Sequence, residues 1–246
     1  MKTKSGKILI AVLLVLIALL SAFVVLLLTN GEKILDNRND VQRYYDNKCQ
    51  SYATQNVNSA KGQIVFVGDS ITDLYILDDH YADLPIACYN RGIGGDTTSG
   101  VLRRLKVSIF DIEPSKVVLL IGTNDINGGC GEEEILERYE QIIDEIYAAL
   151  PEVDLYCVSI IPQNDDIEEY SHIILSETTA KILSINPKIR SLAEEKGATF
   201  VDLFPLLADE NNHLIKEYSD DGLHLNEKGF EVWTSLMKPY FVGEGN

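Results

Sequence analysis

The sequence predicts an α/β fold in which helices cover both faces of a parallel β-sheet. Five short runs rich in β-branched residues alternate with longer stretches of helical periodicity. Within each run the apolar residues are nearly consecutive, which is typical of strands that are buried on both faces. This alternation of strands and helices favours three layers, α/β/α, built around one sheet.

Each element is expected from its local pattern and its flanking turn residues. The strands are expected at 64–67, 86–90, 116–121, 155–161 and 198–202. The helices are expected at about 31–58, 101–109, 132–149, 175–196 and 227–241, with Asn186-Pro187 interrupting the fourth. The polar loop 162–174 is long enough to be functional rather than a simple connector. A flavodoxin-like strand order is expected, and it would place ligands beyond the carboxyl ends of the strands.

Residues 8–28 form an apolar run in which Ser21 is the only polar residue, and three lysines precede it. A helix of this length reaches about 31 Å, which matches a hydrocarbon core of about 30 Å. We therefore expect an uncleaved transmembrane signal anchor. A cleaved signal peptide is the alternative, although its apolar region is usually shorter and ends in small residues. Lys2, Lys4 and Lys7 favour a cytoplasmic N-terminus, which sends the rest of the chain outside the cytoplasm.

These features divide the chain into four parts. They are a cytoplasmic N-terminus at 1–7, the transmembrane anchor at 8–28, a linker and helix at 29–59, and one globular domain at 60–246. The chain carries a formal net charge of −17 and has no Lys/Arg cluster, which argues against nucleic acid as a partner. A membrane, reached through the first helix, is the expected partner besides a small substrate.

Ser70 is the candidate nucleophile because it follows the apolar run Ile64 to Val67 on a polar turn. Gly68 permits a sharp turn at this point, so the hydroxyl faces the crevice where ligands bind. The simpler interpretation is an ordinary helix N-terminus, at which Asp69 or Ser70 accepts hydrogen bonds from free backbone N–H groups.

Two further polar turns follow expected strands. Three glycines within 92–95 give a backbone that can direct its N–H groups at a ligand. A phosphate-binding loop is the alternative for such a run, but the G-x-G-x-x-G spacing is absent. Asn124 places a side-chain amide directly after the strand at 116–121.

A histidine and an aspartate complete the set near the end of the chain. Asp221 and His224 are three residues apart on one turn, so the carboxylate can reach Nδ1 while Nε2 points elsewhere. We expect Ser70 to attack an ester, His224 to accept its proton, and Asp221 to orient the imidazole. The oxyanion would meet three donors: the backbone N–H groups of Ser70 and Gly95 and the side-chain amide of Asn124. Asp220 is the rival for the orienting carboxylate.

Four short segments of the chain resemble the blocks of the SGNH, or GDSL, hydrolases. They are Gly-Asp-Ser-Ile at 68–71, Asn-Arg-Gly-Ile-Gly-Gly-Asp at 90–96, Gly-Thr-Asn-Asp at 122–125 and Asp-Gly-Leu-His at 221–224. The resemblance extends over most of residues 60–240. It implies a flavodoxin-like α/β/α fold and metal-free esterase chemistry, with Ser70, Gly95, Asn124 and His224 in the four roles that name the family.

The branch that looks most similar is that of lysophospholipases and platelet-activating-factor acetylhydrolase-like esterases, which includes carbohydrate acetylesterases. The first block of the family often continues with a small residue, whereas this chain has Asp73-Leu74-Tyr75. The resemblance therefore does not define the shape of the acyl pocket.

We thus expect a membrane-anchored, outward-facing serine esterase that hydrolyses short acyl esters, acetyl above all, carried by a carbohydrate or another small alcohol. A lysophospholipase or thioesterase acting on longer acyl chains is the alternative within enzymes. A non-catalytic binding module on the same scaffold is the alternative outside them.

No cofactor is expected, and the cysteines do not suggest a metal site. Cys49, Cys88, Cys130 and Cys157 contain no C-x-x-C pair and no cluster with histidine, which argues against zinc. Four cysteines outside the cytoplasm allow three disulfide pairings, which the sequence leaves open. Cys157 lies in an expected core strand and is expected to be a buried free thiol.

Overall fold

The computed structural model describes residues 2–174 and 177–242, and the side chains of residues 2–15, 18, 28–39 and 168 are not among the described features. The chain divides into two compact units, Met1–Asn47 and Lys48–Asn246. The first unit belongs to helix α1, and the second unit contains the whole sheet.

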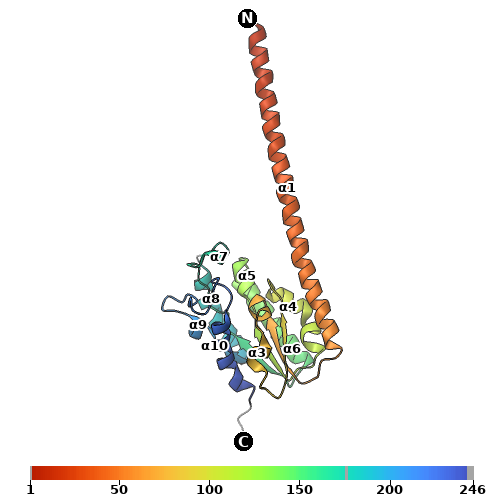
Figure 1. Cartoon of the computed structure of the whole chain (residues 1–246), viewed down its shortest axis with the longest axis vertical. Coiled ribbons are helices and arrows are strands. Elements are labelled where there is room, and N and C mark those ends of the chain that lie inside the picture. Colours follow the sequence, from red (N-terminus) through yellow and green to blue (C-terminus); the bar gives the residue numbers. More distant parts are fainter. Residues whose placement is uncertain (1, 175–176, 243–246) are drawn as a thin grey trace. The chain divides into compact units, whose positions relative to one another are not determined.

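Helix α1 runs without interruption from Lys2 to Asn56 (Figure 1). The expected apolar span at 8–28 and the expected helix at 31–58 are therefore parts of one helix. The expected span falls partly on residues whose side chains lie outside the described part of the structure. Among the described residues, no helix combines the length and the apolar character needed to cross a membrane.

The second unit contains a sheet of five parallel strands in the order β2-β1-β3-β4-β5. The strands are β1 (Ile64–Gly68), β2 (Cys88–Gly92), β3 (Lys116–Leu120), β4 (Asp154–Val158) and β5 (Thr199–Val201). This is the flavodoxin-like order, so the expected topology is confirmed. The register places Gly68 level with Gly92 on one side and with Leu120 on the other. The turns that follow these three strands therefore emerge side by side.

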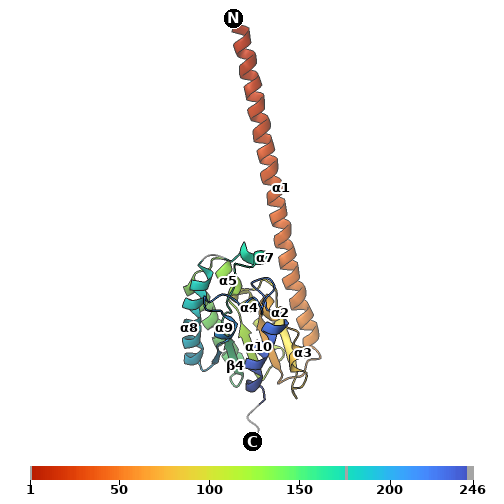
Figure 2. The same ribbon diagram turned by 60° about the vertical axis from the view of Figure 1, so that its left-hand side comes forward.

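Successive side chains of each strand point to opposite faces of the sheet and so build two separate cores. On one face, Val65 and Val67 pack with the helices α4 (Thr98–Leu105), α6 (Glu132–Ala149) and α8 (Thr178–Lys196). On the other face, Ile64 and Phe66 pack with α3 (Leu77–Tyr81), α9 (Phe204–Leu207) and α10 (Glu227–Met237). Helices α3 and α10 lie beside each other in Figure 2. The expected three-layer arrangement is thus present.

Short elements complete the unit around the ends of the strands. They are α2 (Ser70–Asp73), a π-helical turn at Lys106–Phe110, α5 (Thr123–Asn127), α7 (Glu168–Ser171) and a 3₁₀ turn at Lys238–Tyr240. The last of these shows that the expected helix at 227–241 ends as an α-helix at Met237. Helix α7 lies within the segment 162–174, which was expected to be a loop.

Several expected boundaries differ from those of the structure, most of them by one to three residues. Strand β2 begins two residues later than expected, and β4 ends three residues earlier, at Val158. Helix α8 continues through Pro187, where an interruption was expected. The expected start of this helix, near residue 175, lies outside the described residues. A proline costs the helix one backbone hydrogen bond, but the side-chain amide of Asn186 bonds both the N–H and the C=O of Ile160 at 2.9 Å.

Candidate active site

Ser70 is the first residue of α2 and lies two residues beyond the end of β1. Asp69 is the N-cap of this helix, and its side chain accepts a hydrogen bond of 3.0 Å from the backbone N–H of Ile71. A Cβ atom on Gly68 would stand 2.3 Å from the carbonyl oxygen of Leu120, so only glycine fits where the strand turns. The capping role therefore falls to Asp69, and the Ser70 hydroxyl is available for another partner.

That partner is His224, on the turn that precedes α10. The distance from His224 Nε2 to Ser70 Oγ is 2.8 Å, and the distance from His224 Nδ1 to Asp221 Oδ2 is 2.7 Å. The second oxygen of Asp221 accepts hydrogen bonds from the backbone N–H groups of Leu223 and His224. The structure thus brings together three predicted site residues that are 154 positions apart at their extremes.

Hydrogen bonds stabilise the ionised form of the Asp221 carboxyl. Burial acts to raise the pKa of this carboxyl, but bonds from the backbone and ring of His224 and from the backbone of Leu223 outweigh it, so the pKa lies below its ordinary value. Asp220 is exposed and accepts a hydrogen bond from the side chain of Asn226. Of the two neighbouring carboxylates, only Asp221 therefore contacts the imidazole.

The two other predicted residues lie on the turns after β2 and β3. Gly95 has φ +76°, and no atom lies within 4 Å of the place that its Cβ would occupy, so this side of the turn is open. Asn124 is the second residue of α5 (Thr123–Asn127), and its side-chain amide donates a hydrogen bond of 2.8 Å to the backbone carbonyl of Asp96. Because an amide nitrogen carries two hydrogens, one of them remains for a ligand.

Behind these turns lies a layer of buried polar side chains whose roles were not predicted. Asp96 pairs with Arg104 at 2.7 Å, and Arg104 also donates to the backbone carbonyl of Gly68 at the end of β1. Asp125 accepts hydrogen bonds from both the N–H and the hydroxyl of Thr98. These bonds connect the turn after β2 to those after β1 and β3. The aspartates belong to the sequence blocks singled out above, but nothing in the sequence marks Arg104.

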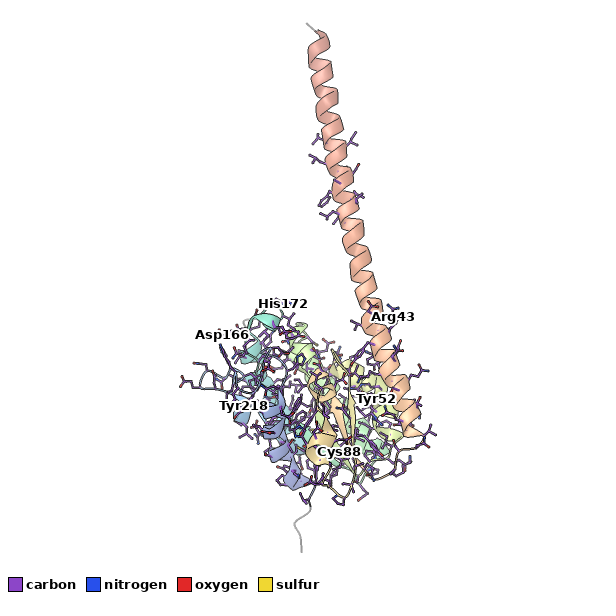
Figure 3. All side chains as sticks on the ribbon, in the orientation of Figure 1. Arg43, Tyr52, Cys88, Asp166, His172 and Tyr218 are labelled. Carbon is purple, nitrogen blue, oxygen red and sulfur yellow. The ribbon has the colours of Figure 1, made fainter. Side chains whose placement is uncertain are left out.

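The segment 162–174 also reaches the candidate site. The ring of Tyr170, on α7, meets the imidazole of His224 edge to face, with 5.3 Å between the ring centres. The backbone N–H of Asn164 donates to the carbonyl of Gly222, within the turn that carries Asp221 and His224. Asp166 and His172 mark this segment in Figure 3. It therefore contacts the turn that carries Asp221 and His224.

The cysteines and the acidic residues do not form a metal site in the described part of the chain. Among residues 2–174 and 177–242, no group of three His, Cys, Asp or Glu side chains is placed to hold a metal ion. Cys88, Cys130 and Cys157 are free thiols, and Cys157 is buried as predicted. Burial raises the pKa of its thiol to about 12, so Cys157 is not a reactive thiolate at neutral pH.

The chain is similar to known proteins in its sequence and in its fold. The sequence profile of the GDSL-like lipase/acylhydrolase family matches residues 66–232, which is more than half of the chain. The platelet-activating factor acetylhydrolase IB subunit alpha1 of Bos taurus is 27% identical over 172 residues, which cover 68% of this chain and 70% of that subunit.

Solved structures agree with this comparison. A protein from Streptococcus pneumonia, described as a candidate platelet activating factor, is 30% identical with a TM-score of 0.80, covering 86% of this chain and 99% of that one. An acetylxylan esterase from Geobacillus stearothermophilus shares the fold, with 17% identity, a TM-score of 0.59 and coverage of 76% and 96%. By the family profile and by its fold, the chain belongs to the GDSL-like lipase/acylhydrolase family.

Proposed function

We propose that this chain is a serine esterase that hydrolyses short acyl esters, acetyl esters above all, by way of an acyl-enzyme on Ser70. The observation that carries the proposal is the continuous hydrogen-bonded series Ser70, His224 and Asp221, with distances of 2.8 and 2.7 Å. This arrangement provides a nucleophile, a base and an orienting carboxylate in contact with one another. The bovine relative described above is named an acetylhydrolase, which supports acetyl as the acyl group.

The reaction proceeds in two halves. Ser70 Oγ attacks the ester carbonyl carbon while His224 Nε2 takes the hydroxyl proton, and Asp221 stabilises the imidazolium that forms. The imidazolium then gives this proton to the alcohol oxygen as the bond between carbon and alcohol breaks, which leaves the acyl group on Ser70. A water molecule attacks the acyl-enzyme in the same way, and the acid leaves with Ser70 restored.

The oxyanion that forms in each half is stabilised by three donors. They are the backbone N–H groups of Ser70 and Gly95 and the side-chain amide of Asn124. The open side of Gly95 gives a substrate oxygen room to approach. One hydrogen of the Asn124 amide bonds the Asp96 carbonyl. The second hydrogen remains available to bond this oxygen.

We further propose that α1 anchors the enzyme in a membrane, with the catalytic unit outside the cytoplasm. Large apolar side chains between Leu16 and Leu27 are 45–65% exposed. A run of such side chains on one helix needs an apolar environment, and the lipid core supplies it. The substrate would then be an acetyl ester of a carbohydrate, or of another small alcohol, outside the cell.

The test of the activity is an acyl-length series measured on the full chain in detergent. p-Nitrophenyl acetate, butyrate, octanoate and palmitate are compared, with the Ser70→Ala variant as the control. We expect turnover that is highest for acetate and absent from the variant. A preference for octanoate or palmitate would favour the lysophospholipase or thioesterase alternative, and equal traces in both proteins would favour a binding module.

A further inference from the structure

Asp73 closes the short helix that Ser70 opens, and its carboxylate bonds in two directions. Its Oδ2 accepts a hydrogen bond of 3.1 Å from the backbone N–H of Gly94. Its Oδ1 pairs with the ammonium group of Lys48. The side chain of Asp73 is only 14% exposed. The carboxylate thus joins the nucleophile helix to the turn that carries Gly95, although it takes no part in the reaction described above.

The turn at Ile93–Asp96 has a geometry that determines where the N–H of Gly95 points. The backbone N–H of Asp96 bonds the carbonyl of Ile93 at 3.1 Å, and φ is positive at Gly95 but not at Gly94. These features define a type II turn, which differs from type I mainly by a flip of its central peptide. That peptide carries the N–H of Gly95. A flip would therefore turn this donor away from the oxyanion.

Two glycines in succession give the chain little preference for one of these turns, because neither residue has a Cβ. The bias comes from the two side chains that hold the turn. Asp73 fixes the N–H of Gly94, and Asn124 bonds the carbonyl of Asp96 at 2.8 Å. We propose that Asp73 is a positioning residue, which keeps the N–H of Gly95 directed at the oxyanion. This inference rests on the proposed esterase function.

The last turns of α1, residues 48–56, support the same segment. The hydroxyl of Tyr52, labelled in Figure 3, donates to the carbonyl of Gly92. The guanidinium of Arg91 bonds the side chains of Gln55 and Asn56, each at 3.0 Å. Together with Lys48, which pairs with Asp73, these residues of α1 fix the position of residues 91–94. Lys48 therefore supports Asp73, and its loss should have a smaller effect than the loss of the carboxylate.

The expected loss of kcat depends on how well the turn still directs the N–H of Gly95. Loss of one oxyanion donor typically lowers kcat by about 10²–10³. In Asp73→Ala the N–H of Gly95 is present but no longer held, so we expect kcat to fall by about tenfold to a hundredfold with KM nearly unchanged. Asp73→Asn keeps an oxygen that can accept from Gly94, and its kcat should fall by less than about fivefold.

The experiment measures kcat and KM for p-nitrophenyl acetate in four variants of the full chain. They are Asp73→Ala, Asp73→Asn, Lys48→Met and the control Asp79→Ala, which removes an exposed carboxylate from α3. Amide hydrogen exchange over residues 92–96 is measured on the same proteins. We expect faster exchange in Asp73→Ala, little change in Asp73→Asn and none in the control.

The two readouts separate the possible outcomes. A fall in kcat for Asp73→Ala, restored largely by Asp73→Asn and accompanied by faster exchange of the turn, supports the positioning role. A kcat within twofold of the wild type, or a fall that Asp73→Asn does not restore, overturns it. If Asp73→Ala does not fold, Lys48→Met must still lower kcat by a few fold, or the inference fails. If the wild type itself hydrolyses no ester, the proposed function fails. Unchanged amide exchange of residues 92–96 in Asp73→Ala would still show, independently, that Asp73 does not fix this turn.

Discussion

Three carboxyl groups lie buried behind Ser70, and each has different hydrogen-bond partners. Asp96 has the guanidinium of Arg104, and Asp125 has two donors from Thr98. Asp69 accepts one bond through Oδ1, while its Oδ2 is buried without a partner among the described residues. Burial above all, and the charges of Asp96 and Asp125 to a smaller extent, raise the pKa of Asp69 to about 7.

This carboxyl makes folding less favourable as the pH rises. Its pKa is 3.8 as a free group and about 7 in the folded chain, so between these values the folded state holds a proton that the unfolded state has lost. The Asp69→Asn variant keeps an oxygen for the N–H of Ile71 and does not titrate. We therefore expect the free energy of unfolding of Asp69→Asn, relative to wild type, to increase by up to about 3 kcal/mol between pH 4.5 and pH 8. Urea unfolding at both pH values measures it, and an equal difference at the two would contradict the expectation.

Asp221 and its neighbour Asp220 form a natural pair of test and control. Asp221→Asn leaves the shape of the turn but favours the wrong imidazole tautomer, so we expect kcat to fall by up to about 10⁴. Asp220→Asn changes an exposed side chain that contacts Asn226 and should cost little. Steady-state kinetics with p-nitrophenyl acetate compares the two. A damaged Asp220 variant beside a normal Asp221 variant would move the triad assignment by one residue.

Asn124 is expected to act mainly in the transition state. Asn124→Ala removes an amide that can bond the oxyanion, so kcat should fall by about a hundredfold or more while KM changes less. The change also removes the bond to the Asp96 carbonyl, so the thermal midpoint should be recorded for the same protein. An ordinary kcat in a folded Asn124→Ala enzyme would remove this residue from the oxyanion site.

The sequence could predict Ser70, Gly95 and Asn124 because each lies on a turn that follows a strand. Ser70, Gly95 and Asn124 occupy turns that the parallel order brings together, and Asp221 with His224 follows from a spacing of three. The partners behind them could not be found in this way. Arg104 lies in the last turn of an amphipathic helix, where nothing in the local pattern distinguishes it from the exposed Arg103.

Helix α4 connects the turns after β1 and β2 through the buried side chain of Arg104. Arg104 pairs with Asp96 and donates to the backbone carbonyls of Gly68 and Arg91. Both charged groups of the pair are at most 2% exposed. The helix thus fixes the ends of β1 and β2 against the turn that carries Gly95.

Replacing Arg104 by methionine should therefore be costly. It leaves the carboxylate of Asp96 buried without its cation, and we expect a loss of about 3–5 kcal/mol in the free energy of unfolding. Arg103→Met, one residue earlier on the exposed face, should change it by less than about 0.5 kcal/mol. Chemical denaturation of both variants measures the difference. Similar values for the two would mean that the buried pair adds nothing to stability.

Element boundaries were predicted best where the local pattern and the tertiary structure agree. Strand β3 and helix α6 match their expected ranges because buried strands and amphipathic helices carry strong periodic signals. Helix α8 was expected to break at Pro187, but its buried face of Ile182, Ile185 and Ile189 continues across the proline and packs in the core. The amide bonds from Asn186 to Ile160 link residues 26 positions apart, so local patterns could not show them.

At the level of the whole chain, one helix, α1, contains both the apolar residues between Leu16 and Leu27 and residues 48–56 of the second unit. Residues 48–56 of that helix contact the segment that leads to Gly95, as described above. The part before them carries the exposed apolar side chains between Leu16 and Leu27. The proposed anchor and the residues that support the segment leading to Gly95 therefore belong to the same helix. The orientation of the proposed anchor would then decide which esters the proposed esterase meets.

The orientation is predicted from the charges at the start of the chain. Lys2, Lys4 and Lys7 precede an uncharged span, and lysines flanking a membrane segment favour the cytoplasmic side. The catalytic unit should then face outward, so protease added to intact cells that produce the full chain should digest it, while a cytoplasmic marker protein stays whole. The same cells should hydrolyse an acetyl ester that cannot cross the membrane. If the unit resists protease until the cells are lysed, the orientation is the reverse, and the substrate must be sought in the cytoplasm.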